Sequence, residues 1–159
     1  MKNCKFSHVF AAILFVVCLA FAGCTQPTNP TPHMAIEGTW VSSYGEKYEI
    51  TNTNYRNYYT SNGKFVLYYT TNNLSFREID SKSGYVYGQF DNGDYVGYGA
   101  KVGDWYALYY TDLTDTSVKL WQPYKAGGKA CCENLYEAIN EFTVANGYYA
   151  AYSECVKQE

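Results

Sequence analysis

Histidine is almost absent from this sequence, and its scarcity removes several kinds of catalytic site. The chain contains only His8 and His33, and both precede the segment that we expect to fold. A Ser-His-Asp triad, a Cys-His dyad and a histidine-based zinc site all need an imidazole. Two close carboxylate pairs remain, and each is more typical of a turn: Asp91 with Asp94, and Asp112 with Asp115. We therefore predict no enzymatic activity, no cofactor and no metal site.

Positive charge is also sparse. The chain has 12 lysines and arginines against 15 aspartates and glutamates, with a formal net charge of −3, and its basic residues form no run. A nucleic-acid-binding surface needs clustered basic residues. The composition therefore excludes nucleic acid as a partner.

Apolar runs are short, and the longest one stands at the N-terminus. Residues 9–22 carry no charge and follow Lys2 and Lys5. A membrane-spanning helix needs about 20 apolar residues, whereas a shorter run behind a basic start is typical of a secretory signal. The run ends in Phe21-Ala22-Gly23-Cys24, which resembles the lipobox of bacterial lipoproteins, in the relaxed form known from spirochaetes, with Phe21 where leucine is usual.

This lipoprotein resemblance implies that residues 1–23 are removed as a signal peptide and that Cys24 receives a lipid. The protein would then be held in the cell envelope, anchored to a bacterial membrane, with the outer membrane or the cell surface as the expected place. Each buried CH₂ of an acyl chain adds about 0.8 kcal/mol of membrane affinity. The alternative is an ordinary signal peptide that leaves Cys24 unmodified.

The segment 24–34 has the composition of a tether. It contains three prolines and the polar stretch TQPTNPTP, which favours an extended, semi-rigid spacer. Loss of the signal removes two lysines and no acid, so the formal net charge changes from −3 to −5. Residues 35–159 then suit one compact domain.

Three cysteines remain in this domain: Cys131, Cys132 and Cys155. Export places them in a compartment that permits disulfides. Because adjacent cysteines rarely pair with each other, we expect Cys155 to bond to Cys131 or Cys132. The closed loop of about 24 residues would stabilise the fold by roughly 3 kcal/mol.

The sequence predicts a mainly β structure up to residue 124. Short segments rich in Tyr, Val, Ile, Thr and Trp alternate with Asn, Gly, Ser and Asp about every ten residues. This spacing predicts an antiparallel up-and-down barrel, with a β-sandwich as the alternative. The expected strands are 36–42, 47–51, 54–60, 64–69, 74–80, 85–91, 95–102, 105–111 and 118–123. Turns are expected between them, including Ser61-Asn62-Gly63 and Asn72-Asn73.

One C-terminal helix is predicted over about 132–145. Leu135, Ala138, Ile139 and Phe142 form one apolar stripe. Glutamates 133, 137 and 141 lie on another face, which we interpret as solvated, and Asn146-Gly147 would cap the helix. Residues 148–152 would form a last strand or an extended tail.

The start of the domain resembles the lipocalins. Gly38-Thr39-Trp40 is similar to their Gly-x-Trp motif, in which the Trp closes one end of an eight-stranded barrel. Tyr110-Thr111-Asp112-Leu113 is similar to their Thr-Asp-Tyr turn, with Leu113 departing from Tyr. The family's late arginine, which packs on the Trp, is missing, and Lys119 is the nearest cation in its place.

Two functions fit these features. The resemblance implies a carrier of a small hydrophobic or amphipathic ligand inside the barrel, since a small barrel can hold one such molecule. The interior candidates are Trp40, Tyr48, Phe65, Leu67, Tyr87, Trp105, Tyr109 and Trp121. The alternative is a surface interaction module, an adhesin or a host-factor binder, that recognises a protein partner through tyrosine-rich segments such as 52–62 and 85–98.

Overall fold

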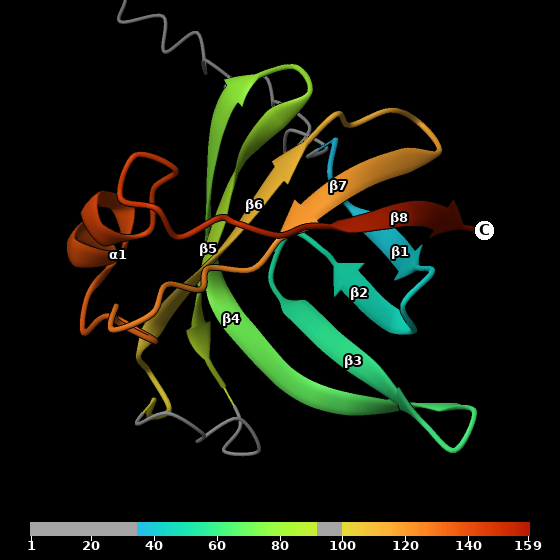
Figure 1. The fold of residues 1–159 in the computed structure, drawn as a ribbon, viewed down its shortest axis with the longest axis horizontal. Helices are drawn as coiled ribbons and strands as arrows, with labels where there is room; N and C mark the ends of the chain where they lie inside the picture. The colour runs from blue at the N-terminus through green and yellow to red at the C-terminus, as the bar shows by residue number, and fades with distance from the viewer. Residues whose placement is uncertain (1–34, 92–99) are drawn as a thin grey trace, which may run out of the picture. The chain divides into compact units, whose positions relative to one another are not determined.

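The computed structural model describes residues 35–91 and 100–159, which form a closed antiparallel barrel with one short helix (Figure 1). Each strand pairs with the next one along the chain, and the first strand also pairs with the last. The predicted up-and-down barrel is therefore confirmed in preference to a sandwich. The elements are β1 (Gly38–Ser42), β2 (Glu46–Ile50), β3 (Tyr55–Ser61), β4 (Lys64–Asp80), β5 (Ser83–Phe90), β6 (Trp105–Thr111), β7 (Ser117–Trp121), α1 (Leu135–Glu141) and β8 (Ser153–Gln158).

Side chains alternate between two apolar layers because successive residues of a strand face opposite sides of the sheet. The inner layer fills the barrel and includes Trp40, Tyr48, Tyr55, Tyr69, Val86, Phe90, Tyr106, Leu108, Leu120 and Cys155. The outer layer covers β5 and β6, where α1 and the chain after it pack against the sheet (Figure 1). Its buried members are Tyr85, Tyr87, Ala107, Cys132, Ala138, Phe142, Tyr148 and Tyr149.

Two Asn-containing segments that resemble turns in the sequence behave differently. Asn62 and Gly63 have φ of 51° and 73° and connect the paired residues Ser61 and Lys64, as in a tight hairpin. Asn73 also has a positive φ of 50°, but there the pairing with β5 is irregular and β4 continues through it. The predicted turn at Asn72-Asn73 is therefore wrong, because the left-handed residue forms a bulge within one long strand.

The predicted helix is too long at both ends. Cys132 exchanges backbone hydrogen bonds with Trp105, which holds it in a β-bridge. The helix begins after Asn134, whose side chain accepts from the Glu137 N–H, and ends at its C-cap Phe142. Residues 148–152 form no strand, and the last strand is β8 instead. Most of the strand expected over 95–102 lies outside the described residues.

Trp40 closes one end of the barrel, as the lipocalin resemblance implies. Its side chain is fully buried, and its Nε1 donates to the Ile36 carbonyl at 2.9 Å. Lys157 places its Nζ 5.2 Å from the Trp40 ring centroid, so this lysine is the cation that packs on the Trp ring. Gly38 has φ of +146°, and a Cβ there would lie 2.7 Å from the Lys157 Cε. Lys119, the cation nearest in sequence to the missing arginine, forms an ion pair with Asp112 at 2.8 Å instead.

Candidate functional site

Four polar side chains form a hydrogen-bonded network inside the barrel. The hydroxyl oxygens of Tyr55 and Tyr69 are 2.6 Å apart, and the Tyr69 hydroxyl donates to Gln122 Oε1 at 3.1 Å. Gln122 Nε2 in turn donates to the Tyr48 hydroxyl at 3.2 Å. Gln122 follows β7, which lies three strands away from both β2 and β4 around the barrel. The network therefore joins opposite walls, and side chains fill the interior at this level.

The network tyrosines remain neutral in this environment. Burial raises the pKa of Tyr48, Tyr55 and Tyr69 well above that of an exposed tyrosine, and mutual repulsion between the phenolates would raise it further for Tyr55 and Tyr69. Each hydroxyl therefore keeps its proton at neutral pH and can both donate and accept. The network is a set of neutral hydrogen bonds rather than a charged site.

A carboxylate marks the end of the barrel opposite Trp40. We call this the Glu46 end; it carries the β1–β2 turn, the β3–β4 turn and the start of β8. Glu46 accepts hydrogen bonds from the Ser153 hydroxyl and, at 3.5 Å, from the Ser42 hydroxyl. None of the ion pairs among the described residues includes Glu46. The side chain is only half-buried, so its charge stays accessible at this end.

Aromatic rings flank Glu46 on the neighbouring hairpin. Tyr59 is directly opposite Glu46 in the β2–β3 register, which places their Cβ atoms about 4.5–5.5 Å apart on one face. The Tyr59 and Tyr68 ring centroids are 5.9 Å apart in an edge-to-face arrangement. Tyr59 is 45% exposed and Tyr68 is 36% exposed. The carboxylate and the partly exposed rings therefore lie together on the Glu46 end.

Asn57 is the next inward-facing residue of β3 after Tyr59. It is 2% exposed and lies between Tyr48 and Tyr69 in the strand register. Its Nδ2 has no hydrogen-bond partner among the described residues. A buried donor without an acceptor costs about 1–3 kcal/mol, so this position calls for an acceptor from a water or a ligand.

A hollow of about 440 Å³ lies beside the segment that follows β7. Tyr106, which belongs to the inner layer, forms its floor, and residues 123–130 form its wall. Tyr148 fixes this wall, because its hydroxyl accepts from the Lys129 N–H at 2.6 Å and its carbonyl accepts from the Tyr124 N–H at 2.8 Å. Small-molecule sites typically have about 300–1,000 Å³. The hollow therefore has the size for one small ligand.

A larger groove of about 570 Å³ runs along β7, β8 and β1. Most of its lining faces outward, as Val41, Lys119 and Val156 do, and it includes none of the four network residues. We regard the smaller hollow as the better candidate because its floor belongs to the barrel interior.

The eight predicted interior residues do not come together. Trp40 and Tyr48 face the interior, where both are fully buried. The prediction is wrong for the other six. Four belong to the outer layer beneath α1 and the C-terminal segment: Tyr87, Trp105, Tyr109 and Trp121. Phe65 and Leu67 lie on the outer face of β4, in register with Thr60 and Tyr58.

Most of the residues described above were not predicted. Tyr106, Leu108 and Tyr110 form the inner face of β6, but they alternate with residues that are equally apolar, so the pattern does not separate the two faces. No local pattern singles out the others: Glu46, Asn57 and Gln122.

The predicted disulfide is also wrong, since Cys131, Cys132 and Cys155 are all free. Cys155 belongs to the inner layer, where it pairs with Ser42 in the strand register. Cys132 is buried in the outer layer, and Cys131 Sγ donates to Asp104 Oδ2 at 3.2 Å. Burial raises the pKa of each of the three thiols to about 12. Cys132 and Cys155 thus lie in different packing layers, whereas Cys131 packs against the inner layer and is free as well.

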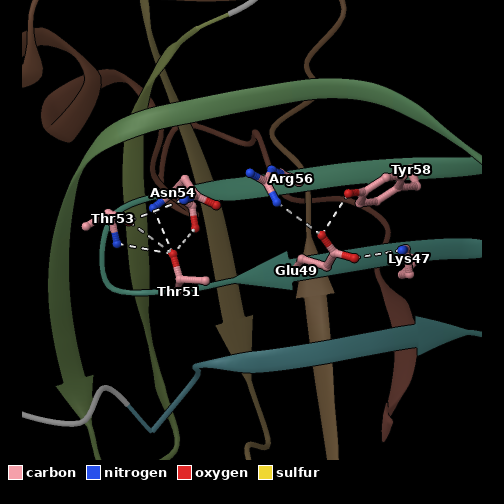
Figure 2. A network of polar contacts seen from close by, with 7 residues as sticks. All are labelled: Lys47, Glu49, Thr51, Thr53, Asn54, Arg56 and Tyr58. Carbon is pink, nitrogen blue, oxygen red and sulfur yellow. Dashed lines mark hydrogen bonds and ion pairs between the residues drawn. The ribbon is translucent and has the colours of Figure 1, made fainter.

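The outer face of β2 and β3 carries a second polar network (Figure 2). Glu49 lies between Lys47 at 2.7 Å and the Tyr58 hydroxyl at 2.7 Å, with Arg56 at 3.7 Å. Partial burial alone would raise the pKa of Glu49, but the hydrogen bonds from Lys47 and Tyr58 outweigh it and lower the pKa. The Lys47 ammonium also lies 3.9 Å from the Tyr58 ring centroid. The Glu49 carboxylate is thus paired with the cations of Lys47 and Arg56, whereas none of the ion pairs among the described residues includes Glu46.

The fold thus defines a closed eight-stranded antiparallel barrel with a polar, partly open end. The chain matches no protein-family profile, no curated protein and no solved structure. Within residues 35–91 and 100–159, no group of three or more His, Cys, Asp or Glu side chains is placed to hold a metal ion. In the same part of the chain, no helix has the length and apolar character needed to cross a membrane. The predicted signal peptide, the predicted tether and Cys24 lie outside the described residues.

Proposed function

We propose that this protein is an exported lipoprotein, held in the cell envelope by a lipid on Cys24, whose barrel binds one small amphipathic ligand in the hollow between Tyr106 and residues 123–130. The observation that carries the proposal is the hollow of about 440 Å³ with the inner-layer residue Tyr106 as its floor. A ligand in this hollow would contact the barrel core while remaining accessible from solvent.

The lining of the hollow supports an amphipathic ligand. The Tyr106 ring, Pro123 and the alanines of the 123–130 wall offer apolar surface. Lys125, Lys129 and the glycine backbone of the same wall offer polar groups. Ligand pockets typically combine a mainly apolar lining with a few placed polar groups.

The inner network limits how deep the ligand can lie. The Tyr48–Gln122–Tyr69 hydrogen bonds connect opposite walls, and the Tyr69 ring packs against Phe90 at 5.5 Å and Tyr106 at 5.7 Å between centroids. A ligand in the centre of the barrel would have to break these contacts. We therefore place the site in the hollow rather than in a deep cavity.

Native mass spectrometry of the full chain, extracted from its own membranes in mild detergent, tests ligand binding. We expect an added mass from a small molecule that dissociates on activation. The Ala126→Trp variant should lose the added mass, because the indole would occupy the hollow, whereas Ala145→Trp, at an exposed position after α1, should retain it. An identical mass pattern in the wild type and both variants would refute this location.

Metabolic labelling tests the anchor separately. Cells supplied with radiolabelled palmitate should label the wild-type chain, and the Cys24→Ala chain should stay unlabelled and leave the membrane fraction. Equal labelling and fractionation of the two chains would refute lipidation at Cys24.

A second function is favoured by the β3–β4 hairpin, which extends away from the rest of the barrel at the lower right of Figure 1. Four of its apolar residues are exposed: Tyr59, Phe65, Val66 and Tyr68. Phe65 lies on the face opposite Tyr59 and Val66, so the hairpin presents apolar side chains on both faces, which suits a surface interaction module that contacts a protein partner. If cells with a Phe65→Ser protein attach to immobilised host proteins as well as cells with the wild type do, this second function is wrong; Tyr44→Ser is the control for an exposed tyrosine elsewhere.

A further inference from the structure

We infer that the ligand of the hollow is an anion and that Lys125 binds its negative group, which we expect to be a carboxylate. The inference rests on the proposed function, because it names the charge of a ligand in the same hollow. Its basis is the charge of the lining, the fixed backbone position of Lys125 and the apolar surface around Tyr106.

The lining of the hollow is positively charged. Among the described residues it contains Lys125 and Lys129 but no aspartate or glutamate. Lys129 forms an ion pair with Glu137, which compensates its charge. Lys125 takes part in none of the ion pairs within residues 35–91 and 100–159. One uncompensated cation therefore borders the hollow, and it matches a ligand group with a single negative charge.

The neighbours of Lys125 attract its ammonium group without neutralising it. The Lys125 Nζ lies 5.5 Å from the Tyr148 ring centroid, within the range of a cation–π contact. Glu141 accepts a hydrogen bond from the hydroxyl of the same tyrosine and forms no ion pair with Lys125. The lysine is exposed, so a ligand can reach its charge from the hollow.

The backbone of the 123–130 wall fixes the base of the Lys125 side chain. The Gly128 N–H donates to the Lys125 carbonyl at 2.9 Å, and Gly127 between them has φ of 72°, as in a tight turn. The Tyr148 hydroxyl accepts from the Lys129 N–H at 2.6 Å, and a Cβ on residue 128 would lie 2.7 Å from that hydroxyl oxygen. The wall is thus formed before a ligand arrives, which lowers the entropy cost of binding.

The rest of the lining favours an anion with an apolar body over an inorganic ion. Tyr106, Pro123 and two alanines, Ala126 and Ala130, contribute apolar surface to the hollow. A hydrated inorganic anion would leave this surface in contact with water, whereas an apolar body would remove it from water. The chemical class is therefore a small aliphatic or aromatic carboxylic acid in its ionised form.

Isothermal titration calorimetry with the full chain in a non-ionic detergent, corrected for empty micelles, tests the charge preference. The probes are 3-phenylpropionate, which is an anion at pH 7, and 3-phenylpropanamide, which is neutral and of nearly the same shape. We expect the anion to bind the wild type at least about tenfold more tightly than the amide.

Three variants locate the preference. Lys125→Gln should remove it, and Lys125→Arg, which keeps the charge, should retain it. Lys64→Gln removes the same charge from an exposed position on the β3–β4 hairpin and should leave the preference unchanged. Ala126→Trp should bind neither probe, because the indole would occupy the hollow.

Equal binding of the two probes to the wild type, no binding of either, or a preference that persists in Lys125→Gln would overturn the inference. Binding of the anion that persists in Ala126→Trp would also overturn it, because the anion would then lie outside the hollow. The proposed function is judged separately by the mass that the native protein carries. It stands if that mass is lost only in Ala126→Trp, even where the probes show no charge preference.

Discussion

Removal of a single hydroxyl from the inner network should destabilise the domain measurably. Tyr48→Phe keeps the fully buried ring but deletes the acceptor for Gln122 Nε2, which lies 3.2 Å from the Tyr48 hydroxyl. The amide N–H of Gln122 would then be buried without an acceptor, which costs about 1–3 kcal/mol. For a domain of this size, the loss corresponds to a fall in Tm of roughly 4–12 °C.

Thermal and urea unfolding followed by circular dichroism would measure the effect, with Tyr44→Phe as the matched control. Tyr44 is 79% exposed, so its hydroxyl should contribute less than about 0.5 kcal/mol. If the free energy of unfolding of Tyr48→Phe lies within about 0.5 kcal/mol of the wild-type value, as for an exposed substitution, then the network does not stabilise the interior.

Three further outcomes are expected. Gly38→Ala should lower the free energy of unfolding in urea by about 1–3 kcal/mol, because φ of +146° is strained for alanine and the new Cβ would displace Lys157 from Trp40. An unchanged free energy of unfolding would contradict this packing at the Trp40 end. Native Cys132 and Cys155 should react with iodoacetamide at pH 8 at least about 100-fold more slowly than in urea, because burial raises the pKa of both thiols to about 12; equal rates would show that they are accessible. The free energy of unfolding should fall as pH rises above about 10, because tyrosines in the unfolded chain lose protons that the buried tyrosines retain. The loss should reach up to about 1.4 kcal/mol per pH unit for each buried tyrosine. Unchanged urea midpoints between pH 9 and 11 would contradict the raised pKa of Tyr55 and Tyr69.

The barrel itself follows from local chemistry that the sequence displays. Asn62-Gly63 marks a hairpin because both residues accept positive φ, and alternation along β2 assigns Tyr48 and Ile50 to the interior. Gly38 and Trp40 identify the closed end, where a Cβ on residue 38 would lie 2.7 Å from Cε of Lys157, the lysine that packs on the Trp40 ring.

The faces of β6 could not be assigned in the same way. Trp105, Ala107 and Tyr109 are as apolar as the residues that alternate with them, because one set packs inside the barrel and the other packs beneath α1. Alternation identifies a buried face only where the other face is polar. The choice of the wrong set placed several ligand candidates in the outer layer.

The residues of the Glu46 end have no local signature for a different reason. Gln122 and Tyr48 are 74 positions apart, and Glu46 and Ser153 are 107 positions apart. Such pairs are brought together only by closure of the barrel between β8 and β1. The disulfide failed on the same ground, since the loop length says nothing about the layer in which each cysteine lies.

A crystal structure of the full chain, purified from the membranes of its own organism, tests the central claim most directly. We expect density for one small molecule in the hollow, in contact with the Tyr106 ring and the 123–130 wall, in protein that has never been exposed to added ligand. Ordered water alone in that hollow would contradict the claim that the hollow is a ligand site.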